Sequence, residues 1–159
     1  GLSIVRPDVE DVDLPKALDT AFKYSDRVMI EQYIKGRELT VAIMGEEAYP
    51  VVEIKPKDGF YDYEHKYTSG MTEYVCPAEL PDKIAEDAKM YALMAHRACG
   101  CSVYSRVDFI IDENNKLYCL EVNTLPGMTS TSLVPKSASA LGMSFSDLLN
   151  KIIELSLNN

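Results

Sequence analysis

Four polar residues on one predicted hairpin carry the most informative chemistry in this chain. Arg106 and Asp108 lie two residues apart in an apolar, β-branched segment. Glu121 and Asn123 have the same spacing in the next such segment. A two-residue turn at Asn114–Asn115, where both residues tolerate positive φ, sets the pairing. It places Asp108 opposite Glu121, so Arg106 falls opposite Asn123. Because side chains alternate along a strand, all four share one face.

This arrangement predicts a site for a divalent cation. Two directly opposed carboxylates repel each other, so Asp108 and Glu121 call for a positive charge beside them. With the amide oxygen of Asn123 they form an oxygen-only set suited to Mg²⁺ or Mn²⁺. The alternative is a solvated strand face on which Arg106 pairs with Asp108. A longer, bulged loop in place of the turn would shift the register.

The opposite face of the same hairpin is apolar, which predicts that it packs on the core. Its residues are Val107, Phe109, Ile111, Leu120 and Val122. Three residues after Asn123, a Pro-Gly turn at Pro126-Gly127 leads into a run of hydroxyl residues ending at Ser132. Backbone N–H groups and hydroxyls in such a loop can hold an oxyanion or a carboxylate. An ordinary Ser/Thr loop is the alternative.

The elements that must position these groups mix strands and helices without regular β-α-β alternation. The chain is therefore predicted to be α+β with a mainly antiparallel sheet. Strand patterns cover residues 2–5, 28–30, 38–44, 48–54, 103–112 and 116–123. Helix patterns cover residues 11–24, 81–99 and 144–157. Residues 56–72 form a long aromatic-rich loop, and loops of that length in compact domains are usually functional.

Composition narrows the class of protein. With 47% hydrophobic and 26% charged residues the chain is predicted to fold as a globular domain. A net charge of −9 without a basic stripe argues against nucleic acid as a partner. No apolar run is long enough to span a membrane, and we expect a cytoplasmic location. The four cysteines are expected to be reduced core thiols, and His96 is expected on a helix surface.

Several motifs, in matching order and spacing, resemble the D-alanine–D-alanine ligase family of ATP-grasp enzymes. The hairpin and the loop after it contribute Ser105–Asp108, Glu121–Thr129 and Ser132–Pro135. Upstream, Gly36–Val41 and Phe60–Tyr67 also match. The resemblance covers the chain from its first residues to the last helix, and it implies the C-terminal half of an ATP-grasp fold.

The resemblance also implies a role for individual residues. Glu31, Gln32, Tyr33 and Ile34 would hold adenine, Glu38 the ribose, and Lys66 the ATP phosphates. Asp108, Glu121 and Asn123 would ligate Mg²⁺ or Mn²⁺. Arg106 and the N–H of Gly127 would stabilise the tetrahedral intermediate. Tyr67 would act from the long loop, and Ser132 with Leu133 would bind the carboxylate of the second D-alanine.

The same resemblance implies the organisation of the protein and its reaction. Residues 1–35 would be the tail of the central ATP-grasp subdomain with the adenine hinge, and residues 36–159 the C-terminal catalytic domain. The reaction would join two D-alanines through an acyl phosphate, for peptidoglycan precursor synthesis, in a homodimeric parent. Family members carry a further N-terminal half, so the isolated chain is expected to be inactive. A ligase for D-lactate or D-serine and a non-catalytic nucleotide-binding module are the alternatives.

Overall fold

A computed structural model describes residue 5, residues 14–56 and residues 72–158. The chain divides into two compact units, Gly1–Lys35 and Gly36–Asn159. The expected strand at 2–5 lies outside the described residues except for Val5, which is in no strand. The long loop with Lys66 and Tyr67 also lies outside them.

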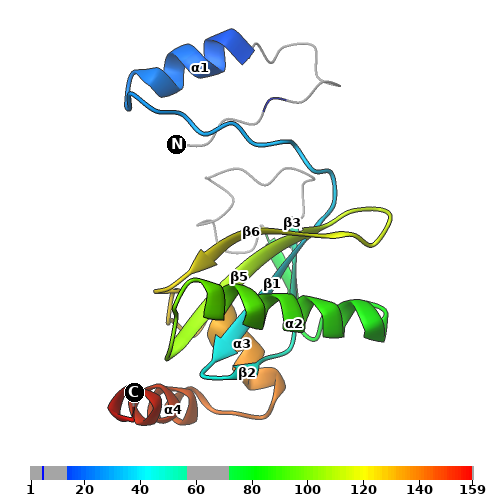
Figure 1. The fold of residues 1–159 in the computed structure, drawn as a ribbon. Helices are drawn as coiled ribbons and strands as arrows, with labels where there is room; N and C mark the ends of the chain where they lie inside the picture. Colours follow the sequence, from blue (N-terminus) through cyan, green and yellow to red (C-terminus); the bar gives the residue numbers. More distant parts are fainter. Residues whose placement is uncertain (1–4, 6–13, 57–71, 159) are drawn as a thin grey trace. The chain divides into compact units, whose positions relative to one another are not determined.

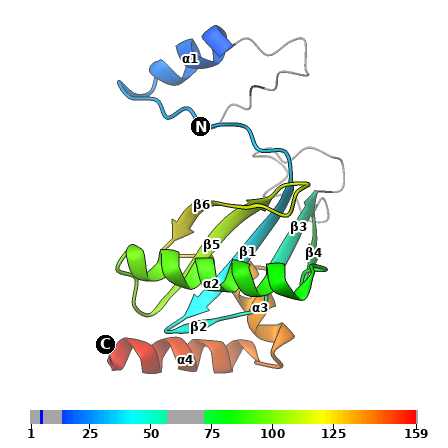
Figure 2. The same ribbon diagram turned by 45° about the vertical axis from the view of Figure 1, so that its right-hand side comes forward.

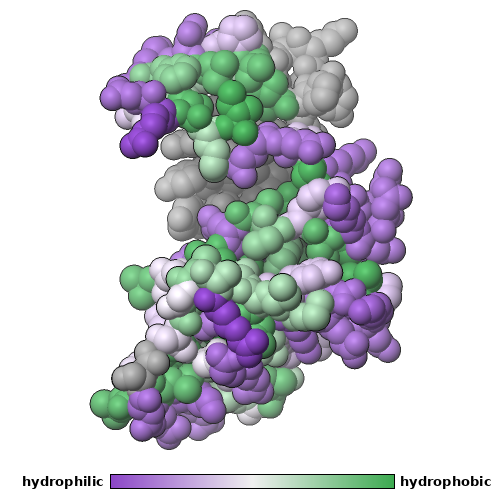
Figure 3. Space-filling view, in the orientation of Figure 1, coloured by the Kyte–Doolittle hydropathy of each residue, from purple (hydrophilic) through white to green (hydrophobic). Residues whose placement is uncertain are grey.

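The first unit contains helix α1, Leu14–Phe22 (Figure 1). Residues 23–35 form neither helix nor strand. The strand expected at Val28–Ile30 is therefore wrong, and Met29 and Ile30 are 79% and 68% exposed. Apolar residues form a buried strand only where another strand pairs with them, and no described segment of this unit does so. Apolar side chains instead gather on the surface of the unit (Figure 3).

The second unit is built on a sheet in the order β4-β3-β1-β5-β6, with β2 paired to β1. All pairings between its described strands are antiparallel, in agreement with the mainly antiparallel sheet that was predicted. Its strands are β1 Arg37–Met44, β2 Glu47–Ala48, β3 Val52–Pro56, β4 Thr72–Val75, β5 Tyr104–Ile111 and β6 Leu117–Asn123. β1 is central, because it pairs with β2, β3 and β5. Its apolar sequence fits this place, and every residue from Leu39 to Met44 is buried. β4 has no counterpart among the strands predicted from the sequence.

One face of the sheet packs against helix α2, Asp82–Ala98 (Figure 2). The core there joins β1 and β5 to the small residues Ala88 and Ala92 of the helix. His96 continues their i, i+4 stripe and is only 1% exposed, so the expected surface position is wrong. The sequence did contain a signal for burial, because His96 follows Ala88 and Ala92 at a spacing of four.

The other face packs against α3, Leu133–Ala140, and α4, Phe145–Leu157. A capping box of Ser144 and Asp147 begins α4, as the predicted helix boundary requires. α3 is absent from the sequence prediction, because its Ser/Thr-rich surroundings and Pro135 favour a loop. Pro135 lies in the first turn of α3, where a helix needs no N–H donor, so the helix can form. None of the described helices is long and apolar enough to cross a membrane.

Candidate functional site

The β5–β6 hairpin pairs Arg106 with Asn123 and Asp108 with Glu121, as the sequence predicts. Antiparallel partners project to the same face of the sheet, so the four side chains share one face. It is the face on which Ala42 and Met44 meet α3 and α4, away from α2.

The loop and the ladder of this hairpin differ from those predicted from the sequence, although the register at Asp108 is the same. Its loop holds three residues, because the N–H of Asp112 bonds the carbonyl of Lys116, and Asn115 adopts φ 62°. The ladder then shifts between Asp108 and Phe109, because Phe109 pairs with Cys119 and Asp108 pairs with Glu121. Leu120 is the extra residue of this bulge and is 48% exposed. The expectation that Leu120 is core is therefore wrong. The extra loop residue and the bulge offset each other.

The carboxylate of Asp108 is held by two neighbours. Arg106 donates to it twice, from Nε to Oδ1 at 2.9 Å and from Nη2 to Oδ2 at 2.7 Å. Thr40, its cross-strand partner on β1, donates to Oδ1 at 2.5 Å. The pairing of Arg106 with Asp108 raised as an alternative is thus present. A carboxylate offers about four lone-pair sites, so three hydrogen bonds leave one on Oδ2 for a cation.

Thr40 is a functional candidate that the sequence did not reveal. It is 1% exposed and also donates to the carbonyl of Val107 at 3.3 Å. A single hydroxyl inside the apolar run of β1 was the available signal. The order of strands was needed to show that this hydroxyl faces Asp108.

The remaining oxygen groups lie on the same face. Asn123 Oδ1 accepts from the N–H of Leu125 at 3.1 Å, which leaves its second lone pair. Glu121 is exposed. Glu38 is half-buried on β1, two residues before Thr40 and therefore on the same face. The described residues contain no group of three or more His, Cys, Asp or Glu that could hold a metal. The predicted set of Asp108, Glu121 and Asn123 is not such a group, because it has two carboxylates and one amide.

The loop after β6 folds back on the start of α3. Ser132 is the N-cap residue of α3, and its Oγ accepts from the N–H of Thr129 at 3.0 Å. A Cβ on Gly127 would lie 3.0 Å from the same Oγ. Leu133 is the first residue of the helix. The structure therefore brings Gly127 and Ser132 together at a helix N-terminus, where backbone N–H groups suit an anion.

The expected adenine-binding residues belong to the first unit. Glu31, Gln32 and Tyr33 are exposed, Ile34 is half-buried, and all four are outside regular secondary structure. Lys66 and Tyr67 lie outside the described residues. The second unit thus brings together Glu38, Arg106, Asp108, Glu121 and Asn123 on one face, and Gly127 with Ser132 in one loop.

Comparison with known proteins gives a consistent result. Relatives include D-alanine–D-alanine ligases from Sphingopyxis alaskensis, 48% identical over 99% of this chain and 52% of the relative, and Geobacter sulfurreducens, 46% identical over 96% and 48%. The crystal structure of the Bacillus anthracis D-alanine–D-alanine ligase complexed with ATP matches with a TM-score of 0.78 and 42% identity, over 91% of this chain and 47% of that one. The D-Ala:D-Ser ligase VanG from Enterococcus faecalis matches with a TM-score of 0.75 and 34% identity, over 89% and 42%.

The chain spans about half the length of the curated relatives that it matches. Its antiparallel sheet with flanking helices is the C-terminal half of the ATP-grasp fold. The model of the family described as "D-ala D-ala ligase C-terminus" matches residues 1–154. The chain belongs to this family.

Proposed function

We propose that this chain is the nucleotide- and metal-binding part of an ATP-dependent ligase that joins two D-alanines. The observation that carries the proposal is the pairing of Asp108 with Glu121 and of Arg106 with Asn123 on one face of the sheet. The family match and the relatives named D-alanine–D-alanine ligase support the reaction and the substrate. Residues 1–35 contribute the adenine hinge, and residues 36–159 form the catalytic domain.

The donor set fits a hard divalent cation. Asp108, Glu121 and Asn123 would hold Mg²⁺ or Mn²⁺, with water and phosphate oxygens completing the coordination. A cation held by these residues would supply positive charge that neutralises the phosphate oxygens of ATP. Thr40 and Arg106 orient the Asp108 carboxylate through the hydrogen bonds described above. Such fixed partners of a ligating group strongly influence metal affinity.

ATP contacts follow the family pattern. Glu31, Gln32, Tyr33 and Ile34 hold the adenine, and Glu38 accepts hydrogen bonds from the ribose hydroxyls. Lys66 contacts the phosphates from the long loop. The similar ligase from Bacillus anthracis is complexed with ATP, which supports ATP as the nucleotide.

The reaction then proceeds in two steps. A carboxylate oxygen of the first D-alanine attacks the γ-phosphorus, and ADP leaves. The amine of the second D-alanine attacks the acyl carbon of the resulting acyl phosphate, loses a proton and displaces inorganic phosphate. Arg106 and the N–H of Gly127 stabilise the oxyanion of the tetrahedral intermediate. Ser132 and Leu133 hold the carboxylate of the second D-alanine at the start of α3, and Tyr67 positions substrate from the loop.

The product is a precursor of peptidoglycan. We propose that the full-length protein is a homodimer in the cytoplasm.

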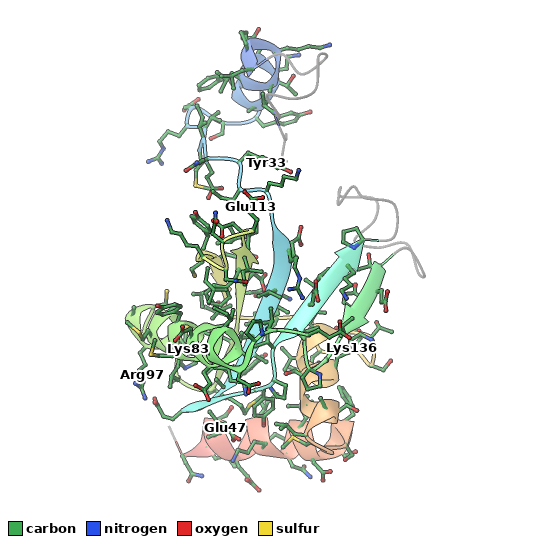
Figure 4. The ribbon with its side chains drawn as sticks, turned by 90° about the vertical axis from the view of Figure 1, so that its right-hand side faces the viewer. Tyr33, Glu47, Lys83, Arg97, Glu113 and Lys136 are labelled. Carbon is green, nitrogen blue, oxygen red and sulfur yellow. The ribbon has the colours of Figure 1, made fainter. Side chains whose placement is uncertain are left out.

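The test uses the full-length protein and measures phosphate release and dipeptide formation with ATP, D-alanine and Mg²⁺. Asp108→Asn and Glu121→Gln should each lower kcat/KM by about a hundredfold or more. Glu113→Gln is the matched control, since Glu113 is an exposed carboxylate at the tip of the same hairpin (Figure 4). Equal losses in all three variants, or ligation of D-serine or D-lactate in place of the second D-alanine, would refute the proposal.

A further inference from the structure

The chain is tightly constrained where it enters the central strand. Gly36 passes directly against β5. A Cβ added there would lie 2.2 Å from the carbonyl oxygen of Ile111 and 2.6 Å from Cγ2 of Ile110. Contacts that short do not occur, and one of the two atoms belongs to the backbone, which cannot move aside easily. Position 36 therefore admits only glycine without a shift of the sheet.

The next residue, Arg37, is held from the other side. Its Nε donates to Glu53 Oε1 at 2.7 Å, and its Nη2 donates to Glu53 Oε2 at 2.7 Å. Nη2 also donates to the backbone carbonyl of Glu79 at 2.9 Å. One guanidinium thus connects β1, β3 and the segment that leads into α2.

Glu53 is a buried charge in an apolar place. Its side chain is 3% exposed, and its partner on β1 is Leu39, a core residue that faces α2. The hydrogen bonds from Arg37, more than any other contact, hold the pKa of Glu53 below its ordinary value. Lys55 adds a weaker contact at 3.5 Å. Removing one partner of such a pair leaves a buried charge uncompensated, whereas replacing both with apolar residues is often neutral for stability.

Glu38 follows immediately on the opposite face. Because residues 36 and 37 are fixed by Ile111 on one side and by Glu53 and Glu79 on the other, the backbone direction at Glu38 is fixed as well. We propose that Arg37 is a positioning residue for nucleotide binding, acting through Glu53 and the Glu79 carbonyl to orient Glu38. This inference rests on the proposed function, which assigns the ribose to Glu38.

The experiment separates positioning from stability in the full-length protein. The variants are Arg37→Met and the double variant Arg37→Met/Glu53→Leu. The control is Arg97→Met, at an exposed arginine that is labelled in Figure 4. This variant removes the exposed ion pair of Arg97 with Glu46. For each variant we would measure Tm, the Kd of a non-hydrolysable ATP analogue with Mg²⁺, and KM and kcat for ATP and D-alanine.

Arg37→Met should lower Tm and raise the Kd and KM for the nucleotide by about tenfold, or about 1.4 kcal/mol of binding, with the KM for D-alanine unchanged. The double variant should recover Tm, since no buried charge is left unpaired, yet keep the weakened nucleotide binding. Arg97→Met should change neither Tm nor nucleotide binding. If the double variant recovered both Tm and nucleotide binding, Arg37 and Glu53 would serve stability alone, and the inference would be overturned. A wild-type protein that ligates D-alanine while Arg37→Met binds the nucleotide normally would refute this inference alone. A wild-type protein without that activity would refute the proposed function.

Discussion

His96 is a buried imidazole with one satisfied nitrogen. Its Nδ1 lies 2.7 Å from Ser105 Oγ, and its Nε2 is buried without a partner in the described part of the chain. Burial lowers the pKa of His96, and this effect exceeds the opposing attraction of Glu46, while the nearby Arg97 adds to the lowering. The folded protein therefore holds His96 neutral at a pH where the unfolded chain already binds a proton.

The sign of the pH effect follows from that difference. As pH falls through the ordinary histidine pKa of about 6.5, the unfolded state takes up the proton first, so the free energy of unfolding decreases. We expect Tm to fall between about pH 7 and pH 5, and His96→Gln, which can still bond Ser105, to flatten that slope. Thermal melts of both proteins across this range are the measurement. Parallel curves for the two proteins would contradict the prediction.

Thr40 supplies a second prediction at the scale of single residues. Thr40→Val keeps the shape but removes the hydroxyl that donates to Asp108 Oδ1 at 2.5 Å. The carboxylate then loses one of its orienting partners, and the Mg²⁺ concentration for half-maximal ligation should rise by about tenfold. A Mg²⁺ titration of the full-length variant measures this. Thr20→Val, on the exposed surface of α1, should leave the titration unchanged. An unaltered Mg²⁺ dependence in Thr40→Val would show that the hydroxyl serves packing alone.

At the scale of elements, the hairpin shows how far counting along the sequence can reach. The pairing of Asp108 with Glu121 was predicted by counting from a two-residue turn, and it holds because the third loop residue and the bulge at Leu120 offset each other. The bulge at Leu120 was not predictable, since a leucine in an apolar strand carries no sign that it is unpaired. α3 was missed for a similar reason, because its stability comes from burying Val134 and Ala138 and not from local propensity.

The bulge itself can be tested by deletion. Removal of Leu120 places Glu121 directly after Cys119, so a regular ladder still pairs Asp108 with Glu121 and Arg106 with Asn123. We expect the full-length deletion variant to retain Mg²⁺-dependent ligation. Deletion of Val122 is the matched control, because it moves Asn123 opposite Val107 and onto the core face. That variant should lose activity. Loss of activity in both variants, with the Leu120 deletion still folded by thermal melting, would show that the bulge is itself required to aim Glu121.

At the scale of the whole molecule, the two units differ in what holds them together. The second unit has two hydrophobic clusters, one on each face of its sheet. α1 in the first unit contains no buried residue, and Leu14 and Phe22 are 45% and 54% exposed. The α+β class was predictable, because the strand and helix patterns are mixed without regular β-α-β alternation. The absence of a strand at Val28–Ile30 was not predictable from the sequence. Whether an apolar segment forms a strand depends on a partner strand, and the segment itself does not encode that partner.

The isolated chain should fold yet fail to make D-alanyl-D-alanine. The two clusters of the second unit bury their apolar faces internally, so this unit needs no further domain to form its core. Catalysis needs both substrates and the γ-phosphate held together, and a misplacement of about 1 Å can cost about a hundredfold in rate. The chain spans about half the length of its relatives, so groups contributed by the other half are missing from it.

The measurement compares phosphate release and dipeptide formation by the 159-residue chain and the full-length protein, with circular dichroism to establish folding. Turnover by the isolated chain within about tenfold of the full-length rate would mean that substrate positioning resides in this half alone. An unfolded chain would instead show that the two clusters are insufficient for stability.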